Sequence, residues 1–176
     1  APFDDHCADV ILRSSDGVDF HVYGAVLSLA SPGFRETLQS LAHPNDRDAA
    51  SVTMGESAVV LDRMLRFFYP GAEPVLTNLE TLREILDGVL LKYGMRFLAP
   101  LGKRYLRSFI EAMPVGVYSV ACRYEWKDVA TEAARHSLRL PIRAFRLAPA
   151  QLQYITADRY HALLKYHTQC SEAAEA

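Results

Sequence analysis

The fold is decided by residues 20–34, which read FHVYGAVLSLASPGF. This stretch has no Asp, Glu, Lys or Arg, but it is too short and too rich in Gly, Ser and Pro to span a bilayer. Its middle part predicts a short apolar helix from Ala25 to Leu29. Ser31 and Pro32 then predict the start of a second helix, because serine can cap a free amide and proline suits the first helical position.

Two β-strands are predicted close to this stretch, over residues 8–14 and 18–22. The residues that join them are Ser-Ser-Asp-Gly. Asp16 and Gly17 both tolerate the positive φ that a tight antiparallel hairpin requires, so we expect such a hairpin here. A third short strand is predicted over residues 51–54.

Helices are predicted for most of the remaining chain. Ser57 caps a helix that runs through Phe68, and Asn78 caps a helix whose apolar stripe continues to Tyr93. We expect Phe68 and Leu86 to lie in one apolar core. Further helices are predicted over residues 101–113, after Pro114 and from near Thr156. Strands therefore crowd the first third of the chain and helices fill the rest, which predicts an α+β fold without βαβ alternation.

The composition restricts the class of protein. The 176 residues carry a formal net charge of −2 and half of them are hydrophobic, which does not fit a dedicated nucleic-acid binder. We expect neither a membrane-spanning segment nor a signal peptide. Cys7, Cys122 and Cys170 are odd in number and far apart. Reduced thiols in the cytosol or nucleus therefore fit better than a disulfide framework.

The sequence holds no convincing catalytic or metal-binding constellation. Cys122 lies in an apolar helical stripe without a histidine at helical spacing, so we interpret it as a small buried hydrophobe rather than a nucleophile. His167 and Cys170 share a helix face, but His161 points elsewhere and a fourth metal ligand is missing. We therefore expect no enzyme activity, no cofactor and no metal.

A basic run near the C-terminal third is interpreted as a solvated helix end, with an acidic partner or phosphate as the alternative. The run consists of Arg135, His136, Arg139, Arg143 and Arg146. An acidic group near the N-terminus disfavours broad contact with DNA. It consists of Asp4, Asp5, Asp9, Asp16 and Asp19.

Four blocks of the sequence resemble the BTB/POZ family, in the order that is typical of it. They read CADVIL at residues 7–12, F…AVL…SPxF within residues 20–34, FFYPG at 67–71 and LKYGM at 91–95. The resemblance implies a BTB/POZ fold, a small mixed sheet with helical hairpins, over residues 1–113.

The rest of the chain, residues 114–176, resembles the all-helical BACK-like extension that follows many BTB domains. The segments VYSVACRY at 117–124 and AARH at 133–136 look most like fungal BTB proteins.

The resemblance implies a non-catalytic scaffold that binds protein partners. BTB/POZ proteins act through exposed helix faces and homodimerisation, and many recruit a cullin scaffold in a ubiquitin ligase. A self-associating scaffold is therefore the leading hypothesis. The alternatives are a substrate adaptor of a cullin-based ubiquitin ligase and a transcriptional regulator.

Five positions are candidate partner-binding residues because they match functional positions of the family. Asp9 matches the acid of a charged corepressor groove, but Tyr23 and Gly24 replace the usual histidine and basic residue. Of the acidic and basic residues that form this groove, only the acid, Asp9, is therefore present. Leu41 and His43 match a cullin-binding apolar-x-Glu motif, with histidine in place of glutamate.

The N-terminal segment bears on how a dimer would form. Residues 1–8 are too few for a stable helix, since isolated helices need roughly 12–15 residues. We therefore expect a dimer contact at the first hairpin and the helix over residues 25–29, rather than an exchanged N-terminal helix.

Overall fold

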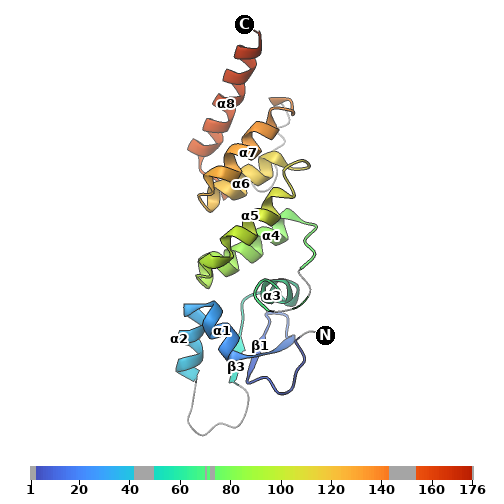
Figure 1. The fold of residues 1–176 in the computed structure, drawn as a ribbon, viewed down its shortest axis with the longest axis vertical. Coiled ribbons are helices and arrows are strands. Elements are labelled where there is room, and N and C mark those ends of the chain that lie inside the picture. The colour runs from blue at the N-terminus through green and yellow to red at the C-terminus, as the bar shows by residue number, and fades with distance from the viewer. Residues whose placement is uncertain (1–2, 42–49, 70, 72–73, 143–153, 176) are drawn as a thin grey trace. The chain divides into compact units, whose positions relative to one another are not determined.

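The computed structural model describes residues 3–41, 50–69, 71, 74–142 and 154–175 (Figure 1). The chain divides into two compact units, one of residues 1–77 with 83–99 and one of residues 78–82 with 100–176. These units do not coincide with the domain limits predicted at residue 113, which stay a prediction. No helix in the described ranges is long and apolar enough to cross a bilayer.

The first unit contains a three-stranded sheet with the order β2-β1-β3. Strand β1 (Val10–Arg13) pairs antiparallel with β2 (Asp19–Val22) and parallel with β3 (Ala50–Thr53). Leu12 lies opposite Phe20 in the register, and both side chains are buried. This mixed sheet, together with the helices, confirms the predicted α+β fold.

The hairpin between β1 and β2 is confirmed, but its turn differs from the prediction. The Gly17 amide donates to the Ser14 carbonyl at 3.0 Å, and the Ser14 amide donates to the Val18 carbonyl at 2.9 Å. Gly17 has a φ of 83°, whereas Asp16 is not in the positive-φ region. The loop is one residue longer than a two-residue turn, so a single left-handed glycine is enough to close it.

The same turn also caps the N-terminus of a helix later in the chain, α3 (Ala58–Leu65). The Oδ1 atom of Asp16 accepts a hydrogen bond from the Ala58 amide at 2.8 Å. Ser57, which we expected to cap α3, makes no capping hydrogen bond with its side chain. The cap is thus supplied from the β1–β2 turn, a long-range contact that local spacing cannot show.

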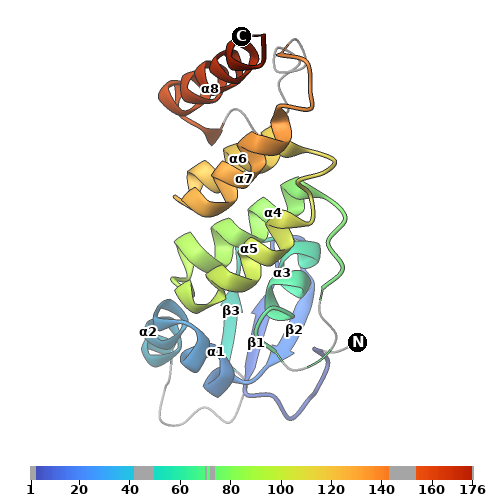
Figure 2. The ribbon, with the colours of Figure 1, turned by 45° about the horizontal axis from the view of Figure 1, so that its top comes forward.

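Two helices follow β2, as the sequence predicts, and lie side by side in Figures 1 and 2. They are α1 (Gly24–Ala30) and α2 (Pro32–Leu41). Between them, the Ser31 Oγ accepts a hydrogen bond from the Phe34 amide at 3.2 Å. The predicted cap at Ser31 is therefore confirmed.

The predicted long helix after Asn78 is instead two helices of different kinds. Asn78 Oδ1 accepts a hydrogen bond from the Glu80 amide at 2.7 Å, so the predicted cap of α4 (Leu79–Leu86) is confirmed. The next turn is a π-helix, η1 (Asp87–Lys92), in which the Tyr93 amide donates to the Gly88 carbonyl five residues earlier. A wider turn of this kind is rare and leaves no mark on an apolar stripe. A 3₁₀ turn, η2 (Arg96–Leu98), follows.

The second unit is helical in its described residues. Its helices are α5 (Ala99–Arg107), α6 (Pro114–Arg123), α7 (Lys127–Ser137) and α8 (Ala157–Glu175). Helix α5 ends at Arg107, six residues before the predicted end. Pro114 takes the first position of α6, where its missing amide costs no hydrogen bond. The prediction of helix for residues 143–153 lies outside the described residues.

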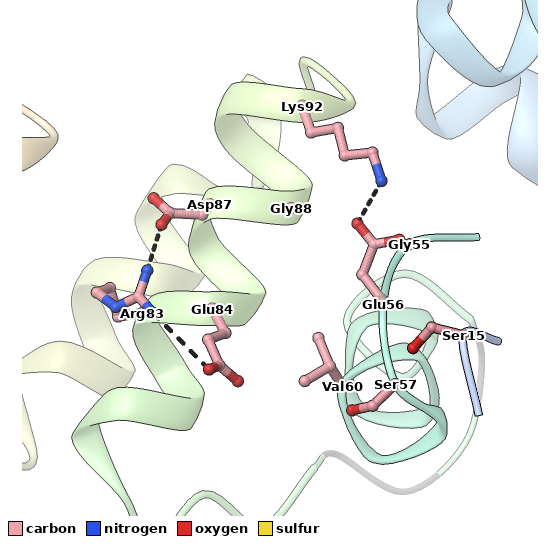
Figure 3. Close-up of a pocket in the computed structure, with 10 residues that line it drawn as sticks. All are labelled: Ser15, Gly55, Glu56, Ser57, Val60, Arg83, Glu84, Asp87, Gly88 and Lys92. Carbon is pink, nitrogen blue, oxygen red and sulfur yellow. Dashed lines mark hydrogen bonds and ion pairs between the residues drawn. The ribbon is translucent and has the colours of Figure 1, made fainter.

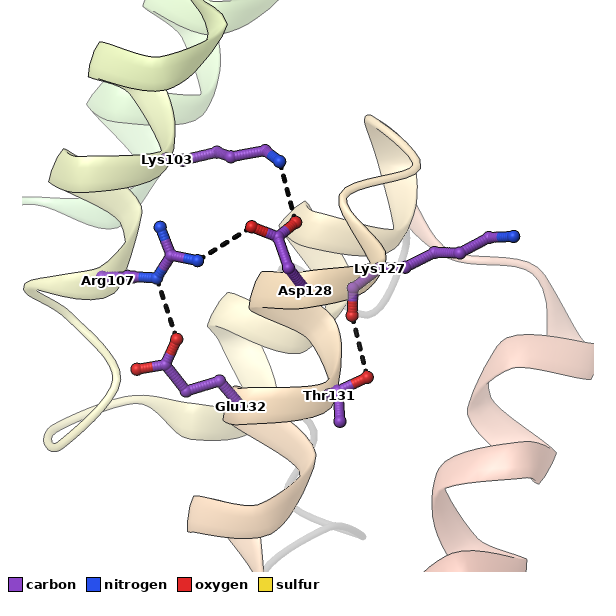
Figure 4. Close-up of polar contacts among 6 residues, drawn as sticks. All are labelled: Lys103, Arg107, Lys127, Asp128, Thr131 and Glu132. Atoms are coloured by element: carbon purple, nitrogen blue, oxygen red, sulfur yellow. Dashed lines mark hydrogen bonds and ion pairs between the residues drawn. The ribbon is translucent and has the colours of Figure 1, made fainter.

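Ion pairs join α5 to α7 within this unit (Figure 4). Asp128 accepts from Lys103 Nζ and Arg107 Nη2, each at 2.8 Å, and Glu132 accepts from Arg107 Nε at 2.8 Å. The hydrogen bond from Lys103, supported by Arg107, lowers the pKa of Asp128 to about 2. These side chains are partly exposed, so the ion pairs orient α5 and α7 more than they stabilise them.

The core expectation for Leu86 and Phe68 is half right. Leu86 is fully buried, but Phe67 is buried in place of the partly exposed Phe68. Helix α3 ends at Leu65, and the amide of Phe67 then bonds three residues back, to the carbonyl of Met64. A tighter turn advances each side chain farther around the axis, which moves the inward position from residue 68 to residue 67.

Replacing Leu86 or Phe67 with alanine is expected to lower the free energy of unfolding by about 2–5 kcal/mol, because each change leaves a cavity. Phe68→Ala is the matched control and should cost about 1 kcal/mol or less, as its ring already touches water. Urea denaturation of the three variants measures this. A loss for Phe68→Ala as large as that for Phe67→Ala would contradict the helix phase described.

Candidate protein-interaction surface

Two of the four sequence blocks meet in the first unit, where they fix α1 and α2. The Ser31 Oγ donates a hydrogen bond to the Tyr93 carbonyl at 2.6 Å. The Phe34 ring stacks on the Tyr93 ring with 4.4 Å between centroids and 6° between planes. Phe34 is only 2% exposed, so this contact belongs to the core. The serine and phenylalanine of SPGF thus bind the tyrosine of LKYGM.

The Tyr93 hydroxyl continues this contact toward the sheet. It donates to Glu56 at 3.1 Å, and Lys92 Nζ lies 2.7 Å from the other oxygen of the same carboxylate. Burial, with the negative charge of Glu56, raises the pKa of Tyr93. The hydroxyl therefore keeps its proton at neutral pH and remains a donor.

A hollow of about 460 Å³ opens beside Glu56 and Lys92 (Figure 3). Its charged groups are paired with one another, since Arg83 bonds to Asp87 at 2.5 Å and Lys92 bonds to Glu56. No histidine or cysteine is among the described residues that line it.

The start of α1 is held by Asp9, one of the five predicted positions. Its Oδ1 atom accepts a hydrogen bond from the Gly24 amide at 2.8 Å. A Cβ atom on Gly24 would lie 3.0 Å from Val10 Cγ2 and 3.3 Å from Asp9 Oδ2. Glycine therefore allows the carboxylate to approach the backbone, and Asp9 acts as a helix cap supplied from the strand β1 side.

Tyr69, from the FFYPG block, holds Tyr23, the residue that precedes Gly24 in the chain. Its hydroxyl accepts a hydrogen bond from the Tyr23 amide at 2.7 Å and donates to the Tyr23 carbonyl at 3.2 Å. Burial raises the pKa of Tyr69 to about 12, so the phenol stays neutral and can do both. Sequence reasoning missed a role for this hydroxyl, and the tyrosine of the FFYPG block was the signal that could have indicated it.

The N-terminal residues cover the outer edge of β2. The His21 amide donates to the Phe3 carbonyl at 2.8 Å, and Asp4 forms a parallel bridge with His21. The Phe3 side chain is buried, with its ring edge-on to Tyr69 at 5.4 Å. The Tyr23 hydroxyl donates to Asp5. This segment therefore protects an edge strand that could otherwise pair with another chain.

One face of α1 remains exposed although its backbone is fixed. Ala25 and Leu29, four residues apart, are both exposed, and Val26 beside them is half-buried. Leu29 is 82% exposed, an unusual position for a leucine on a helix that also buries Leu27 completely. We call Ala25, Val26 and Leu29 the α1 surface.

The structure brings three of the five predicted positions together and not the other two. Asp9, Tyr23 and Gly24 meet at the start of α1, and Tyr23 is 41% exposed. Leu41 ends α2, but its side chain and all of His43 lie outside the described residues. A role of these five residues in partner binding stays a prediction.

Cys122 and His167, considered above as catalytic or metal-binding side chains, lie in surroundings that favour a structural role. Cys122 is half-buried, and burial raises the pKa of its thiol, which disfavours the nucleophilic thiolate. His167 is buried, and its Nε2 hydrogen-bonds with the Leu140 carbonyl at 3.1 Å. The described residues hold no group of three His, Cys, Asp or Glu side chains that could bind a metal.

The basic run has an acidic neighbour that the sequence does not suggest. Glu111 bonds to Arg139 at 3.1 Å and lies 3.4 Å from the His136 Nδ1 atom. Arg143 and Arg146 are outside the described residues. The described part of the run is therefore partly neutralised.

Tyr69→Phe should lower the free energy of unfolding by about 1–2 kcal/mol, because the Tyr23 amide loses its acceptor, whereas the Tyr23 carbonyl keeps the amides of Val26 and Leu27. Tyr23→Phe removes the same kind of atom from an exposed contact and should cost less than about 0.5 kcal/mol. Chemical denaturation of both variants tests this. Equal effects would show that the Tyr69 hydroxyl does not anchor α1.

A comparison with protein-family models gives one match, to the BTB/POZ domain, over residues 3–109. No curated protein matches the chain. The matched residues contain the whole sheet, both helices at the Ser31 contact and the tyrosines that anchor them. BTB/POZ domains are protein–protein interaction modules and typically not enzymes. Since the match spans more than half of its 176 residues, this chain belongs to the BTB/POZ domain family.

Proposed function

We propose that the protein is a non-catalytic scaffold that self-associates through the α1 surface. The observation that carries this proposal is Leu29, an apolar side chain 82% exposed on a seven-residue helix. Hydrogen bonds that Asp9 and Tyr69 accept, and one that Ser31 donates, hold the chain at or beside both ends of that helix. A rigid apolar face of this kind loses little entropy when it binds a partner.

A second copy of the chain is a suitable occupant of the α1 surface. Most homo-oligomers are two-fold symmetric, so the same patch meets itself, and Ala25, Val26 and Leu29 carry no charge that would repel its copy. The surface is small, so the association should be weak and dependent on concentration. The docked position of Phe3 on β2 supports a dimer without an exchanged N-terminal segment.

The test is sedimentation velocity over a dilution series. The wild-type chain is expected to sediment faster as its concentration rises, and Leu29→Lys should remain a monomer throughout because it places a charge in the contact. Leu91→Lys is the matched control, since Leu91 is 58% exposed on η1 and should leave the association unchanged.

A wild-type chain that is monomeric at every concentration would contradict self-association. Loss of the dimer in Leu91→Lys but not in Leu29→Lys would move the contact away from α1. Circular dichroism of each variant checks that it is folded. Deleting residues 1–6 is a poorer test, because it also removes the buried Phe3 from Tyr69 and Phe20.

We further propose that residues 114–176 form a BACK-like helical extension to a BTB domain of residues 1–113, as in fungal relatives. The support is the helical pair α6 and α7 followed by α8, with Tyr118 of α6 donating to the Arg159 carbonyl of α8 at 2.9 Å.

A substrate adaptor of a cullin-based ligase is the main alternative. The helical part that follows the BTB match favours it, as does the placement of Leu41 at the end of α2. Co-purification of a cullin with the tagged chain would support this alternative. The transcriptional regulator has weaker support, because Asp9 is bonded to the Gly24 amide and forms no ion pair with a basic residue in the part of the chain that the structure describes.

A further inference from the structure

A groove lies in the second unit, beyond the residues that match the family. It has a volume of about 410 Å³ and is bounded by α6, α7 and α8. Its apolar lining comes from Ala130, Ala134, Ala162 and Leu163. Leu163 is 1% exposed, and the contacts of Tyr118 with Arg159 and of His167 with Leu140 hold α8 in place. The groove is thus formed by packed helices.

The charge around the groove has one sign. Lys127, Arg135 and Arg159 line it, and no acidic residue is among its described lining. None of the three cations forms an ion pair with a described carboxylate. Lys103 and Arg107, by contrast, are both paired with acids of α7. Figure 4 shows Lys127 extending away from those ion pairs.

We propose that this groove binds a short acidic peptide segment of a partner protein, with at least one apolar side chain. The apolar side chain would pack on the alanines and Leu163, and the carboxylates would meet Lys127, Arg135 and Arg159. Hydrogen bonds between a guanidinium and a carboxylate are among the strongest in proteins. Arg135 and Arg159 offer two guanidinium groups and Lys127 an ammonium, and none of them pairs with a described carboxylate. This site is separate from the α1 surface of the proposed function.

A peptide fits the groove better than a nucleic acid does. Nucleic-acid affinity comes largely from many phosphate contacts, whereas this groove has three cations around an apolar lining. The formal net charge of −2 points the same way.

The test begins by selecting from a random dodecapeptide library on the immobilised full-length chain. Peptides that combine acidic and apolar residues are expected to be enriched, and their binding is then measured by fluorescence anisotropy. Arg159→Glu should weaken binding about tenfold or more, because it reverses a charge that faces the peptide. Lys165→Glu is the matched control on α8, outside the groove, and should change affinity less than about twofold.

A second variant tests the apolar part. Ala162→Trp fills the groove from an exposed position of α8 and should abolish binding without unfolding the chain, as checked by circular dichroism. Leu29→Lys should bind the peptide normally, so failure of self-association and failure of this site are distinguishable.

Four outcomes would overturn the proposal. They are no enrichment of any peptide, enrichment of peptides without acidic residues, binding that Arg159→Glu leaves unchanged, and tight binding of a labelled single-stranded oligonucleotide that Arg159→Glu abolishes. The last would assign the groove to nucleic acid.

Discussion

The Ser31 hydroxyl is the contact on which the first unit depends. It donates to the Tyr93 carbonyl at 2.6 Å and accepts from the Phe34 amide at 3.2 Å. A single hydroxyl group therefore caps α2 and connects it to the end of η1. The residue is fully buried, and a buried hydroxyl without partners would be costly. Its two bonds, with Phe34 stacked on Tyr93, fix the direction in which the α1–α2 pair leaves the sheet.

Helix α1 is held by hydrogen bonds at both of its ends. Asp9 and Tyr69 fix its first residues, and the Ser31 amide bonds to the Leu27 carbonyl at its end. Seven residues would not form a stable helix alone, so this helix exists because other parts of the chain hold it. The same contacts use up its polar ends and leave the apolar α1 surface toward solvent, which links the family blocks of the sequence to a surface suited to binding protein.

Local rules predicted part of this structure and failed where distant residues decide. The hairpin and the caps at Ser31 and Asn78 follow from turn and capping preferences that act within a few residues. The cap of α3 by Asp16, the Tyr69 anchor and the Glu111 contact with Arg139 join residues far apart, which spacing cannot show. The sequence did not predict the π-helix or the burial of Phe67 in place of Phe68. Both result from a local change in the number of residues per helical turn, which the spacing of apolar residues hardly reveals. The sequence therefore predicted a contact on the helix over residues 25–29, but it did not show that Leu29 would be 82% exposed. A role of Asp9, Tyr23 and Gly24 in partner binding stays a prediction.

The central claim, that α1 is a rigid binding face, can be tested by amide hydrogen exchange of the wild-type chain at low and high protein concentration. Self-association through the α1 surface predicts slower exchange over residues 23–30 at high concentration, because contact with a second copy suppresses local opening. Exchange over residues 157–175, in α8, should not change with concentration. Slower exchange confined to α8, or exchange that is independent of concentration throughout the chain, would contradict the claim.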